Sequence, residues 1–313
     1  MIYHFILNPK SGRSKRQVQM EQDIFNACSK RQLSYHIYYT VAQGDATNYV
    51  KEMVNQYPGE RQRFICVGGD GTVNEIANSV PNNQNIEFGV IPNGSGNDFV
   101  RNFTGLRHFS SIDAQIDGEP ITLDLIKCNE YYCVNMVNIG FDCSVVLESN
   151  RFRKFKFISP SISYMLGVLV GFFKKFGTNM RLIYDDGTVV EKTLTLTAIG
   201  NGKFCGGGFK SAPLANLTDG LFDICSIDKV SRLQFISLVG AYKEGTFLDK
   251  KSAQKVMKYT QQKHFRMEFD DVRPICIDGE IVHAQAVDFT LVPRCFNFVL
   301  PKGSRLRFPD KNT

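Results

Sequence analysis

The chain has 313 residues, 43% of them hydrophobic, and it carries 37 Lys and Arg against 31 Asp and Glu, a formal net charge of +6. Because this length exceeds what one core usually organises, two domains are expected. The mild positive charge suits anionic partners such as nucleotides or an acidic membrane surface. No nucleic-acid-binding signature accompanies the charge, so nucleic acid is not expected as a partner.

Nine cysteines occur without a C-x-x-C pair, and several stand inside apolar runs. This usage is typical of free thiols in a reducing compartment and predicts no zinc site. The N-terminus lacks the basic region of a signal peptide. The longest uninterrupted apolar run, Tyr164–Phe173, is shorter than the ~20 residues that span a bilayer. We therefore expect a cytoplasmic protein.

The first 120 residues are predicted to alternate strands with helices. The strands are Ile2–Leu7, Ser34–Thr40, Phe64–Val67 and Phe88–Ile91. The helices are about Ser14–Lys30, Asp45–Gln56, Val73–Val80 and a short helix that ends near Phe103. This alternation predicts a parallel sheet with right-handed crossovers. Three polar turns, after Leu7, Val67 and Ile91, follow strand ends, which is the edge where open α/β sheets bind ligands.

The turn after Phe64–Val67 reads Gly-Gly-Asp-Gly-Thr, and Thr72 with Glu75 matches a capping box. A helix should therefore begin directly after the turn. Its free N–H groups, its positive dipole end and the missing Cβ atoms suit a phosphate chain. Because Asp70 would repel phosphate, we expect a Mg²⁺ ion with its waters between Asp70 and a nucleotide. The alternative is a tight βα turn with a solvated Asp.

After residue 120 the pattern changes to successive strands. They are Ile121–Cys128, Tyr131–Asn138, Met180–Tyr184, Val189–Gly200, Leu221–Ile227, Phe265–Phe269, Ile275–Ile277, Ala286–Leu291 and Phe296–Leu300. Two helices interrupt them, roughly Ser159–Lys175 and Val230–Phe247. The succession predicts an antiparallel β-sandwich or barrel with appended helices, beginning near residue 120.

Neither a Walker A motif nor a Rossmann fingerprint occurs, but several ordered motifs closely resemble the diacylglycerol-kinase catalytic-domain family, which shares its GGDGT turn with NAD kinases. The motifs are Asn8-Pro9-x-Ser11-Gly12, Thr40 before Gly44-Asp45-Ala46, Gly68-Gly69-Asp70-Gly71-Thr72 with Asn74-Glu75, Pro92-x-Gly94-Ser95-x-Asn97-Asp98-Phe99-x-Arg101, Ala212-Pro213 through Asp219-Gly220-Leu221, and Asp278-Gly279-Glu280. Their order and spacing fit the soluble bacterial lipid kinases over nearly the whole chain.

The resemblance implies an α/β plus all-β kinase that uses ATP. A phosphofructokinase/NAD-kinase-like nucleotide domain, residues 1–120, would precede an antiparallel β-sandwich domain, residues 121–299, with ATP in the cleft between them. Residues from about 300 to 313 are allowed to pack back on the first domain. The nucleotide would be lined by Asn8, Pro9, Lys10, Ser11, Gly12, Thr40, Gly68, Gly69, Asp70, Gly71, Thr72, Val73, Asn74 and Ser95. Ser95 keeps the hydroxyl of the Thr that is frequent in the family.

Asp278-Gly279-Glu280 holds the candidate general base, because a primary hydroxyl must lose its proton as it attacks the γ-phosphate. The resemblance gives Glu280 the role of proton acceptor and includes Asp278 in the catalytic network. The sequence alone does not separate the two residues. Without the other motifs, a β-turn with two solvated acids would be the default interpretation.

The segment Asn216–Leu221 is rich in oxygen ligands. In related lipid kinases the matching loop holds a structural Mg²⁺. The resemblance assigns the carboxylate of Asp219 and the backbone carbonyls of Asn216 and Leu221 as its ligands, a set that suits a hard divalent ion. As a bare pattern, the segment is also typical of an Asx turn.

The stretch 151–176 combines basic and aromatic residues with an apolar helix. Arg151, Arg153, Lys154 and Lys156 alternate with Phe152, Phe155 and Phe157, and Met165, Leu166, Leu169, Val170, Phe172 and Phe173 precede Lys174 and Lys175. Such a stretch fits transient docking on an anionic membrane. A core-packing helix beside solvated basic residues is an equal alternative.

The predicted function is an ATP- and Mg²⁺-dependent lipid kinase that contacts the membrane peripherally and converts diacylglycerol to phosphatidic acid. Other lipid alcohols, namely a sphingoid base, ceramide or undecaprenol, are alternative acceptors. An NAD-kinase-like enzyme is disfavoured by the Asn-Pro-x-Ser-Gly and Asp-Gly-Glu motifs, and a nucleotide-binding regulator without catalysis would need a broken catalytic motif. A homodimer is compatible with the sequence, which leaves the oligomeric state open.

Overall fold

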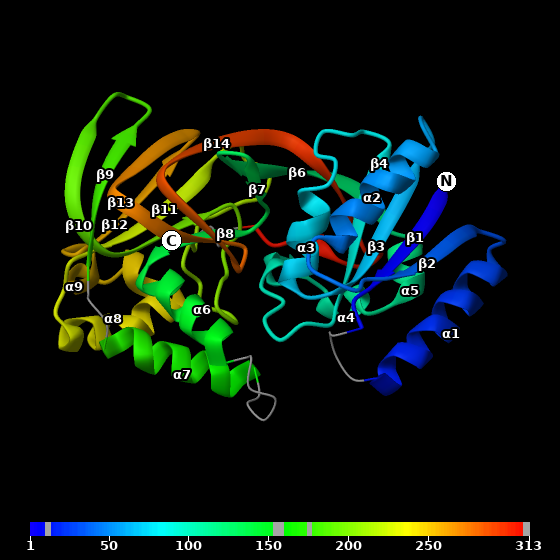
Figure 1. Ribbon diagram of the computed structural model, residues 1–313, viewed down its shortest axis with the longest axis horizontal. Helices are drawn as coiled ribbons and strands as arrows, with labels where there is room; N and C mark the ends of the chain where they lie inside the picture. The colour runs from blue at the N-terminus through cyan, green and yellow to red at the C-terminus, as the bar shows by residue number, and fades with distance from the viewer. Residues whose placement is uncertain (10–13, 153–159, 174–176, 309–313) are drawn as a thin grey trace. The chain divides into compact units, whose positions relative to one another are not determined.

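A computed structural model describes residues 1–9, 14–152, 160–173 and 177–308. Within them the chain forms two compact units (Figure 1). The N-terminal unit comprises Met1–Leu125 and Pro293–Arg307. The C-terminal unit comprises Ile126–Val292, to which Phe308 also belongs.

The N-terminal unit alternates strands and helices, as predicted. Its elements are β1 (Ile2–Leu7), α1 (Ser14–Lys30), β2 (Ser34–Tyr39), α2 (Asp45–Gln56), β3 (Gln62–Gly68), α3 (Asp70–Ala77), β4 (Ile86–Pro92), the 3₁₀ turn η1 (Phe99–Asn102), β5 (Phe103–Thr104), α4 (Leu106–Phe109), α5 (Ile112–Ile116), most of β6 (Glu119–Cys128), the end of β14 (Glu280–Leu300) and β15 (Arg305–Leu306). The parallel strands lie in the order β14-β4-β3-β1-β2.

Helices cover both faces of this parallel sheet. Alternate residues of β1, Phe5 and Leu7 among them, pack with Ile24 of α1 and Ile116 of α5 in one apolar cluster. His4, which points the other way, contacts Tyr49 of α2, with Nδ1 3.0 Å from the Tyr49 hydroxyl. The period-2 pattern of buried strands therefore supplies two cores, one for each helical layer.

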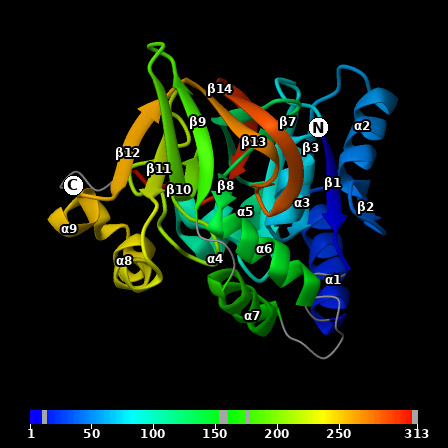
Figure 2. The same ribbon diagram turned by 60° about the vertical axis from the view of Figure 1, so that its left-hand side comes forward.

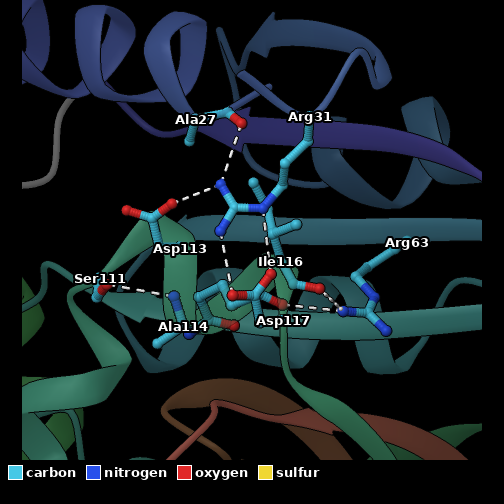
Figure 3. A network of polar contacts seen from close by, with 9 residues as sticks. Ala27, Arg31, Arg63, Ser111, Asp113, Ala114, Ile116 and Asp117 are labelled. Atoms are coloured by element: carbon cyan, nitrogen blue, oxygen red, sulfur yellow. Dashed lines mark hydrogen bonds and ion pairs between the residues drawn. The ribbon is translucent and has the colours of Figure 1, made fainter. Parts of the chain in front are cut away.

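Two arginines fix α5 on the face of the sheet that α1 also covers (Figure 3). Arg31, just after α1, donates to Asp113 at 2.6 Å and to both carboxylate oxygens of Asp117. Arg63 is buried on β3 and donates to the carbonyls of Gln115 and Ile116 at 2.9 and 2.8 Å. A cation at the C-terminal end of a helix satisfies its last carbonyls and its dipole.

The C-terminal unit is built mainly of antiparallel strands. Its elements are β7 (Tyr131–Cys133), β8 (Met136–Gly140), α6 (Phe141–Phe152), α7 (Pro160–Phe173), β9 (Thr178–Tyr184), β10 (Val189–Gly200), β11 (Phe222–Asp228), α8 (Arg232–Glu244), the 3₁₀ turn η2 (Thr246–Leu248), α9 (Lys251–Gln254), β12 (Met257–Gln262), β13 (His264–Ile277) and the first part of β14. Strand β10 pairs with β9 along its first half and with β8 along its second. Both partners also pair with β13, so the strands wrap around one apolar core.

Several predicted boundaries in this unit were wrong. The two strands expected in 265–277 are one strand, β13, with an irregular register between Glu268 and Arg273. The two expected in 286–300 are likewise one strand, β14, which contains the left-handed residue Arg294. The helix α6 and the strand β12 were not predicted at all. The sequence did not indicate helix α6, because its buried face is not uniformly apolar and includes the polar residues Glu148 and Ser149.

Helices α6 and α7 pack at very short range. A Cβ atom on Gly167 would lie 2.6 Å from the carbonyl oxygen of Val145, and one on Gly171 would lie 3.4 Å from the Val145 side chain. Small residues four apart let the two helix backbones approach each other. Among the described residues, no helix is long and apolar enough to cross a bilayer.

All nine cysteines are buried free thiols. Three lie in the N-terminal unit (Cys28, Cys66 and Cys295) and six in the C-terminal unit (Cys128, Cys133, Cys143, Cys205, Cys225 and Cys276). Burial raises the pKa of the Cys28 thiol in the N-terminal unit to about 11, and it raises that of the Cys276 thiol in the C-terminal unit to about 12. These thiols therefore serve as small apolar core groups, as the sequence predicted.

Candidate functional site

The three polar turns of the N-terminal unit meet at one sheet edge. The register pairs Leu7 with Val67, and Val67 with Ile91, so the strands β1, β3 and β4 end side by side. Backbone bonds continue across the ends, from Asn8 N–H to the Val67 carbonyl at 3.1 Å and from Asn93 N–H to the Gly68 carbonyl at 2.8 Å. The structure thus brings together the segments that the sequence assigned to the nucleotide.

The glycines at this edge are required by contacts between the turns themselves. A Cβ atom on Gly68 would lie 2.4 Å from the Thr72 hydroxyl oxygen, and one on Gly94 would lie 2.5 Å from the Cα of Gly69. No real Cβ contact is that short. Gly69 and Gly94 therefore let the backbones of two turns touch, a role that the sequence did not reveal.

Asp70 is the first residue of α3, and its carboxylate reaches the next turn. Oδ1 accepts the N–H of Phe99 at 3.1 Å, the first residue of η1. A Cβ atom on Gly96 would lie 2.9 Å from Oδ2. Asp70 therefore ties the second turn to the third, a structural role that the sequence did not reveal. Its predicted contact with a hydrated Mg²⁺ stays a prediction.

The predicted capping box was wrong. Helix α3 begins at Asp70 after the N-cap residue Gly69, so Thr72 is inside its first turn, where Thr72 and Val73 N–H both reach the Gly69 carbonyl. Glu75 instead accepts the N–H of Ala46 at 3.1 Å, in the first turn of α2. Because the N-cap of α2, Gly44, has no side chain, Glu75 supplies the missing acceptor from a neighbouring helix.

The remaining nucleotide candidates occupy different environments. Thr40 is buried and continues the ladder through its N–H to the Leu7 carbonyl at 3.0 Å, and Val73 is a core residue. Pro9 and Ser95 are exposed, whereas Asn8 and Asn74 are half-buried. Asn8 Nδ2 lies 3.5 Å from the Thr72 hydroxyl, which links the first turn to the second. The candidates Lys10, Ser11 and Gly12 lie outside the described residues.

The third turn is closed by an asparagine that the sequence motif contains but does not explain. Asn97 adopts a left-handed backbone with φ of 51°. Its side chain accepts the Gly94 N–H at 2.9 Å and donates to the Gly94 carbonyl at 2.9 Å. Asparagine tolerates this conformation better than most residues. The loop that carries Ser95 is therefore shaped by Asn97.

In the C-terminal unit, Asp278 and Gly279 form the two-residue turn between β13 and β14. Both have positive φ, 48° and 95°, and Ile277 pairs with Glu280. An Asp-Gly pair with this geometry is the favoured tight hairpin turn. The turn therefore fixes Glu280 as the first residue of β14, at a half-buried position.

The Asp278 carboxylate is occupied by backbone donors. Oδ2 accepts the N–H of Val134 at 2.7 Å, and Oδ1 accepts those of Asn135 and Met136 at 3.0 and 2.8 Å. The Cys133 thiol lies 3.3 Å from Oδ1, and burial raises the pKa of that thiol, so it remains a neutral donor. These bonds end the strand pairing at residue 133, which is why the expected strand Tyr131–Asn138 is divided into β7 and β8.

Both oxygens of this carboxylate are engaged by the backbone. Its observed role is therefore to hold residues 134–136 in place. The segment held by Asp278 in turn binds the chain after β10, because the Asn135 carbonyl accepts the N–H of Asn201 and of Gly202 and Asn135 Nδ2 donates to the Phe204 carbonyl at 2.7 Å. Asp278 thus organises residues 134–136 and, through Asn135, the chain at residues 201–204.

The predicted metal loop is built of Asx turns. Asn216 Oδ1 accepts the N–H and hydroxyl of Thr218 at 3.3 and 3.0 Å, and Asp219 Oδ1 accepts the N–H of Leu221 at 3.1 Å. The structure therefore confirms the Asx turn, which the sequence offered as the alternative interpretation of this loop. The loop also contains one carboxylate and several backbone carbonyls, which are the oxygen types that bind Mg²⁺. Among the described residues, no three His, Cys, Asp or Glu side chains cluster as a metal site.

A second acid near this loop was not identified from the sequence. Asp223 on β11 is fully buried, with Oδ1 2.6 Å from the Tyr259 hydroxyl and 3.2 Å from Gln261 Nε2, while no partner of Oδ2 is found in the described structure. Burial, followed by the Asp219 charge, raises the pKa of Asp223 to about 7. An unpartnered buried oxygen beside Asp219 fits a cation-binding loop. The spacing Asp219-x-x-x-Asp223 was the available signal.

Comparison with known families agrees with this geometry. Residues 3–128 match the diacylglycerol kinase catalytic domain, and residues 135–300 match the YegS C-terminal NAD kinase beta sandwich-like domain. The protein belongs to the diacylglycerol kinase family of lipid kinases. A curated relative, the diacylglycerol kinase of Bacillus subtilis, is 26% identical over 316 residues, covering 97% of this chain and 98% of the relative.

Solved structures confirm the predicted fold of this lipid kinase. A diacylglycerol kinase from Bacillus anthracis superposes with a TM-score of 0.66 at 21% identity, covering 95% of this chain and 96% of that one. An NAD kinase from Archaeoglobus fulgidus, solved with ATP, has a TM-score of 0.50 at 9% identity and covers 96% and 94%. The α/β nucleotide fold followed by a β-sandwich-like domain is therefore shared with NAD kinases.

Proposed function

We propose that this lipid kinase transfers the γ-phosphate of ATP to the hydroxyl of diacylglycerol and releases phosphatidic acid. The observation that carries the proposal is the Asp-Gly hairpin, in which Asp278 is bound by three backbone N–H groups and Glu280 opens the next strand. The name of the Bacillus subtilis relative supports diacylglycerol as the acceptor.

In this proposal Glu280 is the general base. It accepts the proton of the acceptor hydroxyl as the oxygen attacks the γ-phosphorus, and the bond from that phosphorus to the bridging oxygen of ADP breaks. Asp278 is a positioning residue, because its carboxylate is already bound by the N–H groups of Val134, Asn135 and Met136. The proposed base thus stands next to a hairpin turn that is held by the backbone of residues 134–136.

The N-terminal unit supplies the nucleotide donors in this proposal. The three interlocked turns after β1, β3 and β4 present backbone N–H groups at the start of α3, together with the hydroxyl of Ser95. Backbone donors at a helix N-terminus suit a phosphate chain. Asp70 faces the same turns, and it would contact Mg²⁺ through the water molecules of that ion.

Magnesium is proposed in two places. On ATP, Mg²⁺ neutralises phosphate charge during transfer. In the loop Asn216–Leu221, a structural ion would be held by the Asp219 carboxylate and the carbonyls of Asn216 and Leu221. Calorimetric titration with MgCl₂ alone should detect this second site, and Asp219→Asn should abolish it.

The acceptor is tested with a panel of lipid alcohols. Purified protein, labelled ATP and Mg²⁺ are incubated with diacylglycerol, ceramide, a sphingoid base and undecaprenol in detergent micelles. We expect the fastest phosphorylation with diacylglycerol. Preference for another alcohol would replace the acceptor and keep the kinase, whereas phosphorylation of NAD alone would refute the lipid acceptor.

The base is tested with Glu280→Gln. Turnover should fall by about 100-fold or more, since general bases contribute roughly that much, while ATP affinity and thermal stability remain those of the natural chain. An unchanged turnover would remove Glu280 from the mechanism.

Peripheral contact with a membrane is part of the same proposal, because the acceptor resides in a bilayer.

A further inference from the structure

Helices α7 and α8 of the C-terminal unit carry large apolar side chains on the protein surface. The exposed fractions are 81% for Leu233, 73% for Phe173, 56% for Ile236, 54% for Leu169 and 47% for Ile162. Single exposed apolar residues need no explanation, but several on two adjoining helices indicate a contact surface.

On each helix these residues form a stripe. Ile162, Leu169 and Phe173 are spaced by seven and four residues along α7, with the partly buried Leu166 between them. Leu233 and Ile236 are spaced by three along α8, and the stripe continues to Gly240, where an added Cβ would meet nothing within 4 Å. Spacings of three, four and seven place residues on one helix face.

The two stripes belong to adjoining helices. Arg232, at the start of α8, donates through Nε to the Phe172 carbonyl at 2.8 Å, and Nη2 lies 3.5 Å from the Phe173 carbonyl. Its guanidinium also lies over the Phe172 ring, 6.0 Å from the centroid. The end of α7 is thus fixed to the start of α8, and both views show the two helices below the strands of the unit (Figures 1 and 2).

Basic residues accompany the apolar ones. Lys229, Arg232 and Lys243 are exposed on or beside α8. Over residues 229–258, which include α8, η2 and α9, seven Lys or Arg stand against two acids, Glu244 and Asp249. A second apolar protein surface would not require this excess of one charge, whereas an anionic bilayer does.

We propose that the surface formed by Ile162, Leu169, Phe173, Leu233 and Ile236, here termed the α7–α8 surface, docks on an anionic phospholipid membrane. Apolar side chains enter the boundary between headgroups and acyl chains, and the flanking Lys and Arg pair with lipid phosphates. The proposal rests on the proposed function only in its choice of partner, since a lipid acceptor brings the protein to a bilayer. Most of the basic stretch that the sequence singled out, 153–159 and 174–176, lies outside the described residues.

The test measures vesicle binding without catalysis. The protein is sedimented with vesicles of phosphatidylcholine alone or with vesicles in which about one lipid in three is phosphatidylglycerol, at about 0.15 M salt. We expect binding to the anionic vesicles only. The double variant L233Q/I236Q should bind about tenfold or more weakly, because two apolar side chains no longer enter the interface. Lys229→Gln with Lys243→Gln should weaken binding and reduce its salt dependence.

The matched control is Val272→Gln, which replaces an exposed apolar residue on β13 and should leave binding unchanged. Circular dichroism melting verifies that each variant folds. The proposal would be overturned if L233Q/I236Q bound anionic vesicles as tightly as the unsubstituted chain does, or if the unsubstituted chain bound both vesicle types equally. So would a dimer that the double variant dissolves, since the surface would then meet a second copy. Because kinase activity is measured separately in detergent micelles, its loss or retention does not decide this test.

Discussion

The carboxylate of Asp278 accepts the backbone N–H of Val134 at 2.7 Å, across 144 residues of chain. Together with the bonds to Asn135 and Met136, it ends one strand and begins the next. The adjacent acid, Glu280, shares a three-residue motif with Asp278 but has a different environment. This relationship separates a residue that shapes the site from the residue that we propose to act in it.

Replacing Asp278 by Asn should therefore destabilise the protein. An amide offers one acceptor oxygen to three N–H donors and turns its own NH₂ group toward some of them. We expect the free energy of unfolding to fall by about 1–3 kcal/mol, the cost of buried polar groups without partners. Urea unfolding measures the change. Glu280→Gln is the control, and an equal loss of stability in both variants would contradict the assignment.

The contact between Gly69 and Gly94 gives a second prediction. Gly94→Ala places a methyl group where 2.5 Å is available, so the two turns must separate, and both stability and ATP affinity should fall. The control is Gly240→Ala in α8, where nothing lies within 4 Å, and which should stabilise by about 0.5–1 kcal/mol. Thermal melting with and without ATP checks both variants. Unaltered nucleotide binding in Gly94→Ala would show that the turns need not touch.

Asp223 should make stability depend on pH. Its pKa is raised to about 7 by burial, whereas the unfolded side chain titrates near pH 4. Between these values the folded state binds more protons than the unfolded state, so this residue lowers the free energy of unfolding as pH rises from about 4 to about 7.

Asp223→Asn should remove that slope. Urea unfolding at a series of pH values, without divalent cations, gives the difference between the natural chain and the variant. The difference isolates Asp223 from Asp142, whose pKa burial raises to about 6, and from His4, whose pKa burial lowers to about 4. The exposed Asp249→Asn serves for comparison. Parallel curves for Asp223→Asn and the natural chain would contradict the pKa.

Glu75 should act as a cap supplied by a neighbouring helix. Glu75→Ala removes the acceptor of the Ala46 N–H and should cost about 0.5–2 kcal/mol, as the loss of a helix cap does. Glu75→Gln keeps an acceptor oxygen and should cost much less. Chemical denaturation compares the two. If both substitutions were equally harmful, the negative charge rather than the acceptor would matter.

Much of the N-terminal unit could be predicted from the sequence. The strand Ile2–Leu7 and the helices Ser14–Lys30 and Asp45–Gln56 have the predicted limits, because long periodic segments with polar flanks determine their own structure. The three turns also lie at one edge, since parallel strands must end together. The family and the fold were predicted from several ordered motifs, and the comparisons with known proteins confirmed both.

The remaining features depend on contacts that no local pattern contains. Thr72 and Glu75 have the spacing of a capping box, yet Glu75 serves a helix 29 residues earlier. The division of Tyr131–Asn138 follows from an acid more than 140 residues later. Burial of Asp223 is likewise invisible in the sequence. The backbone donors around the Asp278 carboxylate, which support our proposal of Glu280 as the base, are also invisible in the three-residue motif.

The buried thiols make the unmodified chain a reporter of its own opening. A maleimide reagent can reach a cysteine only when the surrounding structure yields, since all nine are buried. The N-terminal unit contributes three of them and the C-terminal unit six. Mass spectrometry of timed labelling would therefore tell which unit opens first, and whether ATP slows labelling of Cys66 more than that of Cys225, without introducing any probe.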